Sequence, residues 1–165
     1  MAVKFVTLLL VLAMTLAGCE STKYKAGPPP PPTEVTPGST FTVVRGFLVP
    51  SGVSSVFFQD ARLYPEGNIQ SNFPYCELSV GVATADGVLI KEGVYTVSKV
   101  EYDEHAIGTG GTDVSVTTFH LLEAASGKTY LMDCMLPLLS SGSLFVSPAE
   151  VKGAVAEYME LKVAP

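Results

Sequence analysis

The chain has no tryptophan, only two histidines and only three cysteines among its 165 residues. Charged residues make up 16% of the sequence, and the 10 basic residues are outnumbered by 16 acidic ones. The formal net charge of −6 offers no basic surface for nucleic acid, so we expect no nucleic-acid partner. Neither His105 nor His120 has a further ligand at metal-binding spacing, and we therefore predict no metal and no cofactor.

Recognisable catalytic motifs are lacking as well. The sequence contains no Gly-x-Ser-x-Gly elbow. The segment from Gly108 to Thr112 is rich in glycine, but a phosphate-binding loop requires a helix after it, and a strand-like segment follows here. We therefore expect a non-enzymatic chain without catalytic residues, and a hydrolase whose nucleophile is not recognisable is the alternative.

An apolar segment near the N-terminus is too short to span a membrane. It runs from Phe5 to Leu16, directly after a lysine. About 12 helical residues extend about 18 Å, against the ~30 Å of a bilayer core. The small residues Ala17 and Gly18 then give a peptidase access to the chain, so residues 1–18 are predicted to be a signal peptide.

The stretch Leu16-Ala17-Gly18-Cys19 resembles the lipobox of bacterial lipoproteins. That resemblance implies that Cys19 receives a diacylglyceryl group on sulfur, becomes the mature N-terminus and is N-acylated, for example with palmitate. Two or three acyl chains make a lasting membrane anchor, whereas one chain binds reversibly. Glu20 stands where an aspartate favours retention in the inner membrane, so we expect the outer membrane, facing the periplasm. An uncleaved N-terminal anchor with a chance cysteine is the alternative.

Residues 19–38 are predicted to be a tether. Pro28 to Pro32 are consecutive prolines, which adopt polyproline II at ~3.1 Å per residue and so form a stiff spacer of about 15 Å. Such a spacer would hold a folded domain away from the membrane. A proline-rich docking motif for an aromatic-lined groove is the alternative. Residues 39–165 are expected to form one β-rich globular domain.

Alternation of apolar and polar residues predicts β-strands in this domain. In the third segment, Cys76 and Leu78 fall on one face while Tyr75 and Glu77 fall on the other. Glycine, proline and Asp-Gly turn signals separate the segments. The strand-like segments are 40–49, 53–64, 73–84, 88–90, 93–102, 114–122 and 128–136. We predict a mainly β fold, namely an antiparallel sandwich or small barrel of six to seven strands with one C-terminal helix.

The C-terminal helix is predicted from Ser147 to Lys162. Ser147 is a good N-cap, Pro148 suits the first helical position, and Glu150 completes a capping box. An apolar stripe recurs every three or four residues, at Val151, Ala154, Val155, Tyr158 and Met159. We expect this stripe to pack against a face or the mouth of the sheet.

Cys76 and Cys134 remain as a pair once Cys19 is assigned to lipid. An even pair in an oxidising compartment favours a disulfide. The bond would close a loop of about 58 residues, which corresponds to roughly 4 kcal/mol in the chain-entropy model. Both cysteines fall on apolar strand faces, so the bond is expected in the core. Two buried free thiols are the alternative.

An aromatic and polar cluster surrounds the loop between the second and third strand-like segments. Tyr64, Phe73 and Tyr75 lie near the amides Asn68 and Gln70. Because loops on rigid scaffolds often carry recognition residues, we take Tyr64, Asn68, Gln70 and Tyr75 as the candidate surface for an envelope protein or peptidoglycan partner. Aromatics that merely cap the core at strand ends are the alternative.

Two stretches of the domain resemble a family of proteobacterial envelope proteins. The first includes Phe57-Phe58-Gln59-Asp60 and Pro74-Tyr75-Cys76, and the second runs from Val146 to Met159. The resemblance implies one intact domain that contains both cysteines, and it implies no activity. We therefore expect a membrane-anchored envelope lipoprotein with a non-catalytic binding or structural domain, and an envelope hydrolase of unidentified substrate is the alternative.

Overall fold

The computed structural model describes residues 34–64, 68–108, 111–138 and 145–165. The predicted signal peptide, the lipobox with Cys19 and the run of prolines lie outside the described residues.

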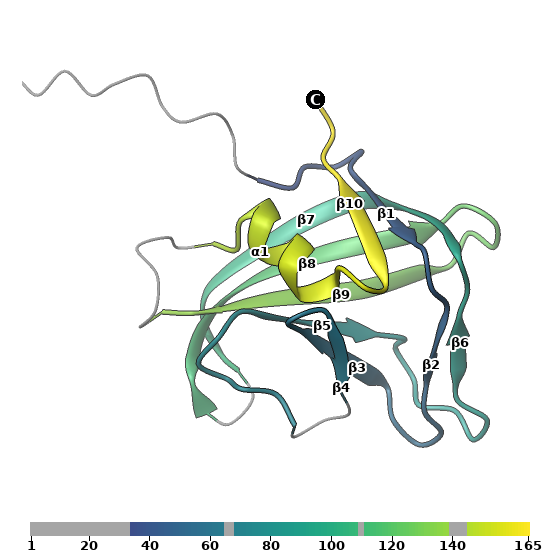
Figure 1. Ribbon diagram of the computed structural model, residues 1–165, viewed down its shortest axis with the longest axis horizontal. Coiled ribbons are helices and arrows are strands. Elements are labelled where there is room, and N and C mark those ends of the chain that lie inside the picture. The colour runs from purple at the N-terminus through teal and green to yellow at the C-terminus, as the bar shows by residue number, and fades with distance from the viewer. Residues whose placement is uncertain (1–33, 65–67, 109–110, 139–144) are drawn as a thin grey trace, which may run out of the picture. The chain divides into compact units, whose positions relative to one another are not determined.

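Ten strands and one helix make up the described part of the chain. They are β1 Thr40–Val43, β2 Phe47–Val49, β3 Ser55–Gln59, β4 Arg62–Tyr64, β5 Tyr75–Ser79, β6 Val88–Ile90, β7 Gly93–Ile107, β8 Asp113–Glu123, β9 Thr129–Pro137, α1 Pro148–Val155 and β10 Met159–Lys162. One antiparallel sheet has the order β10-β1-β7-β8-β9-β5-β3-β4, and β2 pairs with β6 in a second. The large sheet curls, and α1 lies across its open side (Figure 1). The predicted mainly β antiparallel fold with a C-terminal helix is confirmed, with ten strands in place of six to seven.

The hydrophobic core lies between the inner face of the large sheet, the small sheet and α1. The fully buried rings of Phe41 and Phe119 meet on β1 and β8, with centroids 5.7 Å apart. Phe47, on the small sheet, and Phe58, on β3, both contact the ring of Tyr158 edge-on at 5.7 Å. These contacts join strands that are distant in sequence, so the two sheets and the C-terminal segment share one core.

Two segments that alternation predicts as single strands are each divided into two. Between β1 and β2 the chain passes Gly46, where an added Cβ would lie 3.1 Å from the Ile90 carbonyl oxygen. This close approach lets β2 leave the large sheet and pair with β6. Between β3 and β4, Asp60 and Ala61 have φ values of 50° and 62°, the left-handed geometry of a tight hairpin turn.

The prediction of one helix from Ser147 to Lys162 is wrong in its second half. Its capping box and its buried residues in the first two turns are present, but α1 ends at Val155 and residues 159–162 form β10. In β10, burial alternates with a period of two, which is the pattern of a strand beside β1. A glycine within the helix, Gly153, also weakens its continuation.

The fold includes the last residues of the segment that we predicted as tether. The Val35 side chain is 3% exposed and belongs to the core. The Gly38 N–H donates to the Val97 carbonyl oxygen at 2.8 Å, which extends the pairing of this segment with β7. Residues 35–38, which we predicted as the end of the tether, therefore belong to the folded domain.

Candidate functional site

The predicted partner surface is accessible only in part. Asn68 and Gln70 are exposed, and Tyr64, at the end of β4, is half-buried. Tyr75 is 1% exposed, which removes its ring from that surface. The turn between Tyr64 and Asn68 lies outside the described residues.

Tyr75 is buried because the chain at the end of β7 folds over it. The residue lies on the face of β5 opposite Cys76, and its ring centroid is 6.3 Å from that of Phe57. Gly108 approaches so closely that an added Cβ would lie 2.9 Å from the Tyr75 hydroxyl and 2.8 Å from the Val114 side chain. Alternation tells which face of a strand a residue occupies, but it does not tell what covers that face.

The loop between β4 and β5 is held in place by Gln59, which is 3% exposed at the end of β3. The Gln59 Nε2 donates to the Gln70 carbonyl oxygen at 2.9 Å, and Oε1 accepts from the Gln70 N–H at 2.8 Å. Nε2 also lies 3.4 Å from the Phe73 carbonyl oxygen and 3.5 Å from that of Pro74. A single buried amide therefore fixes the backbone that carries the exposed residues of this loop.

Phe73 presents a ring from this loop to solvent, with 56% of its surface exposed. Beside it is a surface hollow of about 210 Å³, here called the α1 groove, which is lined by Asp60, Phe73, Pro74, Glu150, Gly153 and Ala154. Phe73 belongs to the aromatic cluster seen in the sequence, but the residues of α1 lie far along the chain and no local pattern connects them to it. An exposed ring beside a concave surface is typical of protein recognition sites.

Helix α1 forms one wall of the α1 groove, and it is fixed at both ends. At its start, Ser147 Oγ accepts from the Glu150 N–H at 3.3 Å, and Glu150 Oε2 accepts from the Ser147 N–H at 2.7 Å. Near its end, the Ala61 N–H from the β3–β4 turn donates to the carbonyl oxygens of Gly153 at 3.0 Å and Ala154 at 3.1 Å. These last bonds satisfy carbonyl groups that a helix end leaves without intrahelical partners.

The α1 groove combines apolar surface with negative charge and open space. Asp60 and Glu150 line it beside the Phe73 ring. A Cβ added to Gly153 would meet no heavy atom within 4 Å, so the helix leaves room for a partner side chain here. The two carboxyl groups favour a partner segment that carries positive charge.

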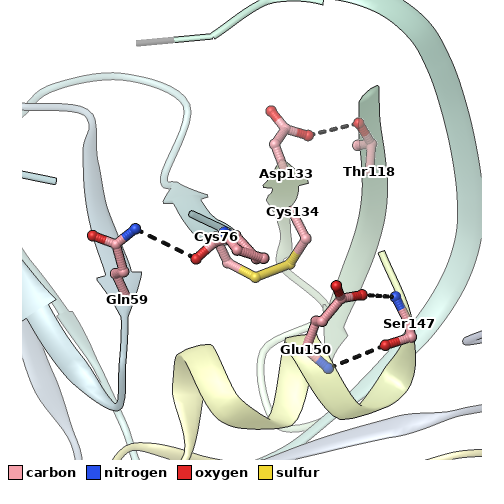
Figure 2. The surroundings of a disulfide bond; sticks show 8 residues. Gln59, Cys76, Thr118, Asp133, Cys134, Ser147 and Glu150 are labelled. Carbon is pink, nitrogen blue, oxygen red and sulfur yellow. Dashed lines mark hydrogen bonds between the residues drawn. A yellow bond between two sulfur atoms is a disulfide. The ribbon is translucent and has the colours of Figure 1, made fainter. Parts of the chain in front are cut away.

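A disulfide lies beneath this region. Figure 2 shows the bond between Cys76 on β5 and Cys134 on β9, with Gln59 and the Ser147–Glu150 capping box drawn around it. The two cysteines are directly opposite each other in the register of these strands, and at most 1% of either residue is exposed. The predicted core disulfide is therefore confirmed, and it ties the β3–β4–β5 part of the large sheet to the β7–β8–β9 part.

A second polar cluster lies on the outer face of the large sheet. The Glu101 carboxylate accepts one hydrogen bond from Lys99 Nζ at 2.7 Å and pairs with His120 Nε2. The hydrogen bond from Lys99, followed by that from His120, lowers the pKa of the Glu101 carboxyl. The cluster has one carboxylate and is open to solvent, and within the described ranges no group of three or more His, Cys, Asp or Glu side chains is placed to hold a metal ion.

Comparison of the chain with protein-family models, curated proteins and solved structures finds no match. In the part of the chain that the structure describes, no helix has the length and apolar character needed to cross a membrane.

Proposed function

We propose that the chain is a membrane-anchored envelope lipoprotein whose folded domain is a non-catalytic binding module. The α1 groove is the surface that contacts its protein or cell-wall partner. The observation that carries this proposal is the exposed Phe73 ring, which borders a hollow and is held on a loop that the buried Gln59 fixes.

The rigidity of both walls supports binding. A loop that is already ordered loses little conformational entropy when a partner binds, so more of the contact energy appears as affinity. Aromatic side chains contribute large contact areas at binding sites, and the Phe73 ring has most of its surface available for such contact. The carboxyl groups of Asp60 and Glu150 would select a partner segment with positive charge.

The anchoring half of the proposal rests on Leu16-Ala17-Gly18-Cys19 and on the prolines that follow. Acylation of Cys19 would place the domain at the outer membrane, facing the periplasm. A Cys19→Ser variant should keep its signal peptide and lose the lipid-modified N-terminal peptide in mass spectrometry of the membrane fraction. Normal processing and normal membrane retention of this variant would contradict the anchor.

The binding half is tested by photo-crosslinking in cells that produce the full chain. A benzophenone amino acid replaces Phe73 in one variant and Val82 in a matched control. Val82 is 77% exposed and lies in the loop between β5 and β6, away from the lining of the α1 groove. We expect a discrete adduct from position 73, with protein or with peptidoglycan, and none of that adduct from position 82.

A third variant separates groove binding from chance proximity. Gly153→Gln places a side chain in the open part of the α1 groove and replaces a helix glycine by a better helix former, so the fold should be kept. The adduct from position 73 should fall at least several-fold in this background. An adduct that is equally strong with Gly153→Gln, or that also forms from position 82, would contradict the proposal.

A further inference from the structure

Strand β10 is an edge of the large sheet. In the described part of the chain it pairs only with β1, with Thr42 opposite Glu160 and Thr40 opposite Lys162. The Val44 N–H donates to the Tyr158 carbonyl oxygen at 2.9 Å. Since hydrogen-bonded and non-hydrogen-bonded positions alternate along an antiparallel pair, this bond shows which residues of β10 bond to β1. Residues 158, 160 and 162 direct their backbone groups to β1, so the backbone groups of Met159 and Leu161 point away from it.

The side chains of β10 alternate between buried and exposed, and the two exposed ones carry opposite charges. Met159 and Leu161 are buried, while Glu160 and Lys162 are exposed and carry opposite charges two residues apart. Neither Glu160 nor Lys162 forms an ion pair within the described ranges. Edge strands with free backbone groups are where a sheet accepts a further strand.

A surface hollow lies beside part of this edge. This hollow, of about 340 Å³, is lined by Met159, Glu160 and Leu161 on the strand and by Lys152 and Ala156 near the end of α1. The free backbone groups of β10 therefore face an open volume.

We propose that β10 pairs with β10 of a second copy of this chain, antiparallel, about a two-fold axis at Leu161. The axis sets Leu161 opposite Leu161 of the other copy as a hydrogen-bonded pair, because its backbone groups point outward. Glu160 of each copy then lies opposite Lys162 of the other, in the closer, non-hydrogen-bonded position. Two ion pairs and one continuous sheet result from a single symmetric contact.

The self-complementary charges are what favour a second copy over an unrelated peptide. A strand with two acids, or with two bases, would oppose itself in this register, whereas Glu160 and Lys162 attract each other across the axis. The contact is on a different surface from the α1 groove and does not depend on the proposed function.

Cysteine pairing in the full-length chain tests the register. The double variant Glu160→Cys/Lys162→Cys sets a thiol of each copy opposite a thiol of the other, whereas either single variant does not. After mild oxidation we expect a dimer that disappears on reduction in the double variant and is at least several-fold weaker in both singles. No dimer from a double variant whose thiols react with maleimide, or equal dimer from the singles, would overturn the proposal.

Charge exchange gives a second, independent test by sedimentation of the full chain. Glu160→Lys alone places lysines opposite lysines, and Lys162→Glu alone places glutamates opposite glutamates, so each should weaken dimerisation about tenfold. The exchanged variant Glu160→Lys/Lys162→Glu restores opposite pairs and should dimerise as the unmodified chain does. Equal behaviour of all four proteins, or a monomer at every concentration, would overturn the two-fold pairing.

Discussion

The side-chain amide of Gln59 and the backbone of Gln70 form two hydrogen bonds with each other, one in each direction, at 2.9 and 2.8 Å. The Gln59 side-chain amide thus bonds the Gln70 backbone as a neighbouring strand would, although residue 70 lies in a loop. Gln59 is buried in the core and Gln70 is exposed, so these bonds hold the surface loop that carries Phe73 against the core.

Replacement of Gln59 should therefore loosen the loop and destabilise the fold. Gln59→Ala removes the partner of the part-buried Gln70 N–H and carbonyl groups and empties a buried position, so we expect a loss of about 1–3 kcal/mol in the free energy of unfolding. Gln70→Ala is the matched control, since it keeps the backbone bonds and removes only an exposed side chain. Urea unfolding and amide hydrogen exchange of residues 68–74 measure the two effects. Equal stability of the two variants would show that the Gln59 amide does not hold the loop.

The disulfide should be important for stability and resistant to reduction. It closes a sequence separation of 58 residues, so its loss is expected to cost about 4 kcal/mol in the chain-entropy model. The Cys76→Ala/Cys134→Ala variant should show this loss in urea unfolding. The unmodified protein should be reduced by dithiothreitol only once denaturant exposes the sulfur atoms, because both cysteines are buried. Reaction of Cys76 and Cys134 with maleimide in protein that is denatured but not reduced would contradict the bond.

Alkaline pH should destabilise the fold through Tyr95. Burial, followed by the charge of Glu123, raises its pKa to about 12, and burial raises the pKa of Tyr130 for the same reason. A raised pKa favours the neutral form in the folded state. The stabilisation is therefore complete below pH 10, the ordinary value, and is lost as the pH rises from 10 to 12. The loss for Tyr95 is expected to be up to roughly 2–3 kcal/mol.

A Tyr95→Phe variant isolates this effect. It should lose about 1 kcal/mol at neutral pH, because the Tyr95 hydroxyl donates to the Lys91 carbonyl oxygen at 3.0 Å. Between pH 10 and 12 its urea midpoint should fall less steeply than that of the unmodified protein. Parallel curves for the two proteins would show that Tyr95 ionises as readily in the folded state as in the unfolded one.

The sequence predicts the strands well where alternation is regular and the partner is the next strand along the chain. Residues 114–122 and 128–136 are predicted as strands, and β8 and β9 span Asp113–Glu123 and Thr129–Pro137, within one residue of the predicted bounds. The pairing of β2 with β6, and of β10 with β1, joins residues that are far apart in sequence, and no local pattern encodes it. For β10, the alternation of Met159 and Leu161 with charged residues is visible in the sequence. The apolar spacing of three and four residues before it also includes Met159, so the change from a helical period to a strand period of two is easily missed.

Only one wall of the α1 groove could be predicted from the sequence. The loop of residues 68–74 is recognisable from its aromatic and amide residues, whereas Asp60, Glu150 and Gly153 come to it through the docking of α1 on the β3–β4 turn. Tyr75 was predicted to be part of the partner surface but is buried. Its burial depends on Gly108, a residue that alternation does not place near it.

Thr117 carries a buried hydroxyl whose removal should stabilise the protein. The residue lies on β8 opposite Cys134 and is 3% exposed, and its Oγ1 has no hydrogen-bond partner among the described residues. A buried hydroxyl without a partner costs free energy relative to an apolar group of the same shape. Thr117→Val should therefore raise the free energy of unfolding by about 1 kcal/mol, whereas Thr117→Ser, which keeps the hydroxyl and loses the methyl group, should lower it by a similar amount. Urea midpoints of the three proteins should follow the order Val, Thr, Ser, and a Val variant less stable than the unmodified protein would mean that the hydroxyl is satisfied.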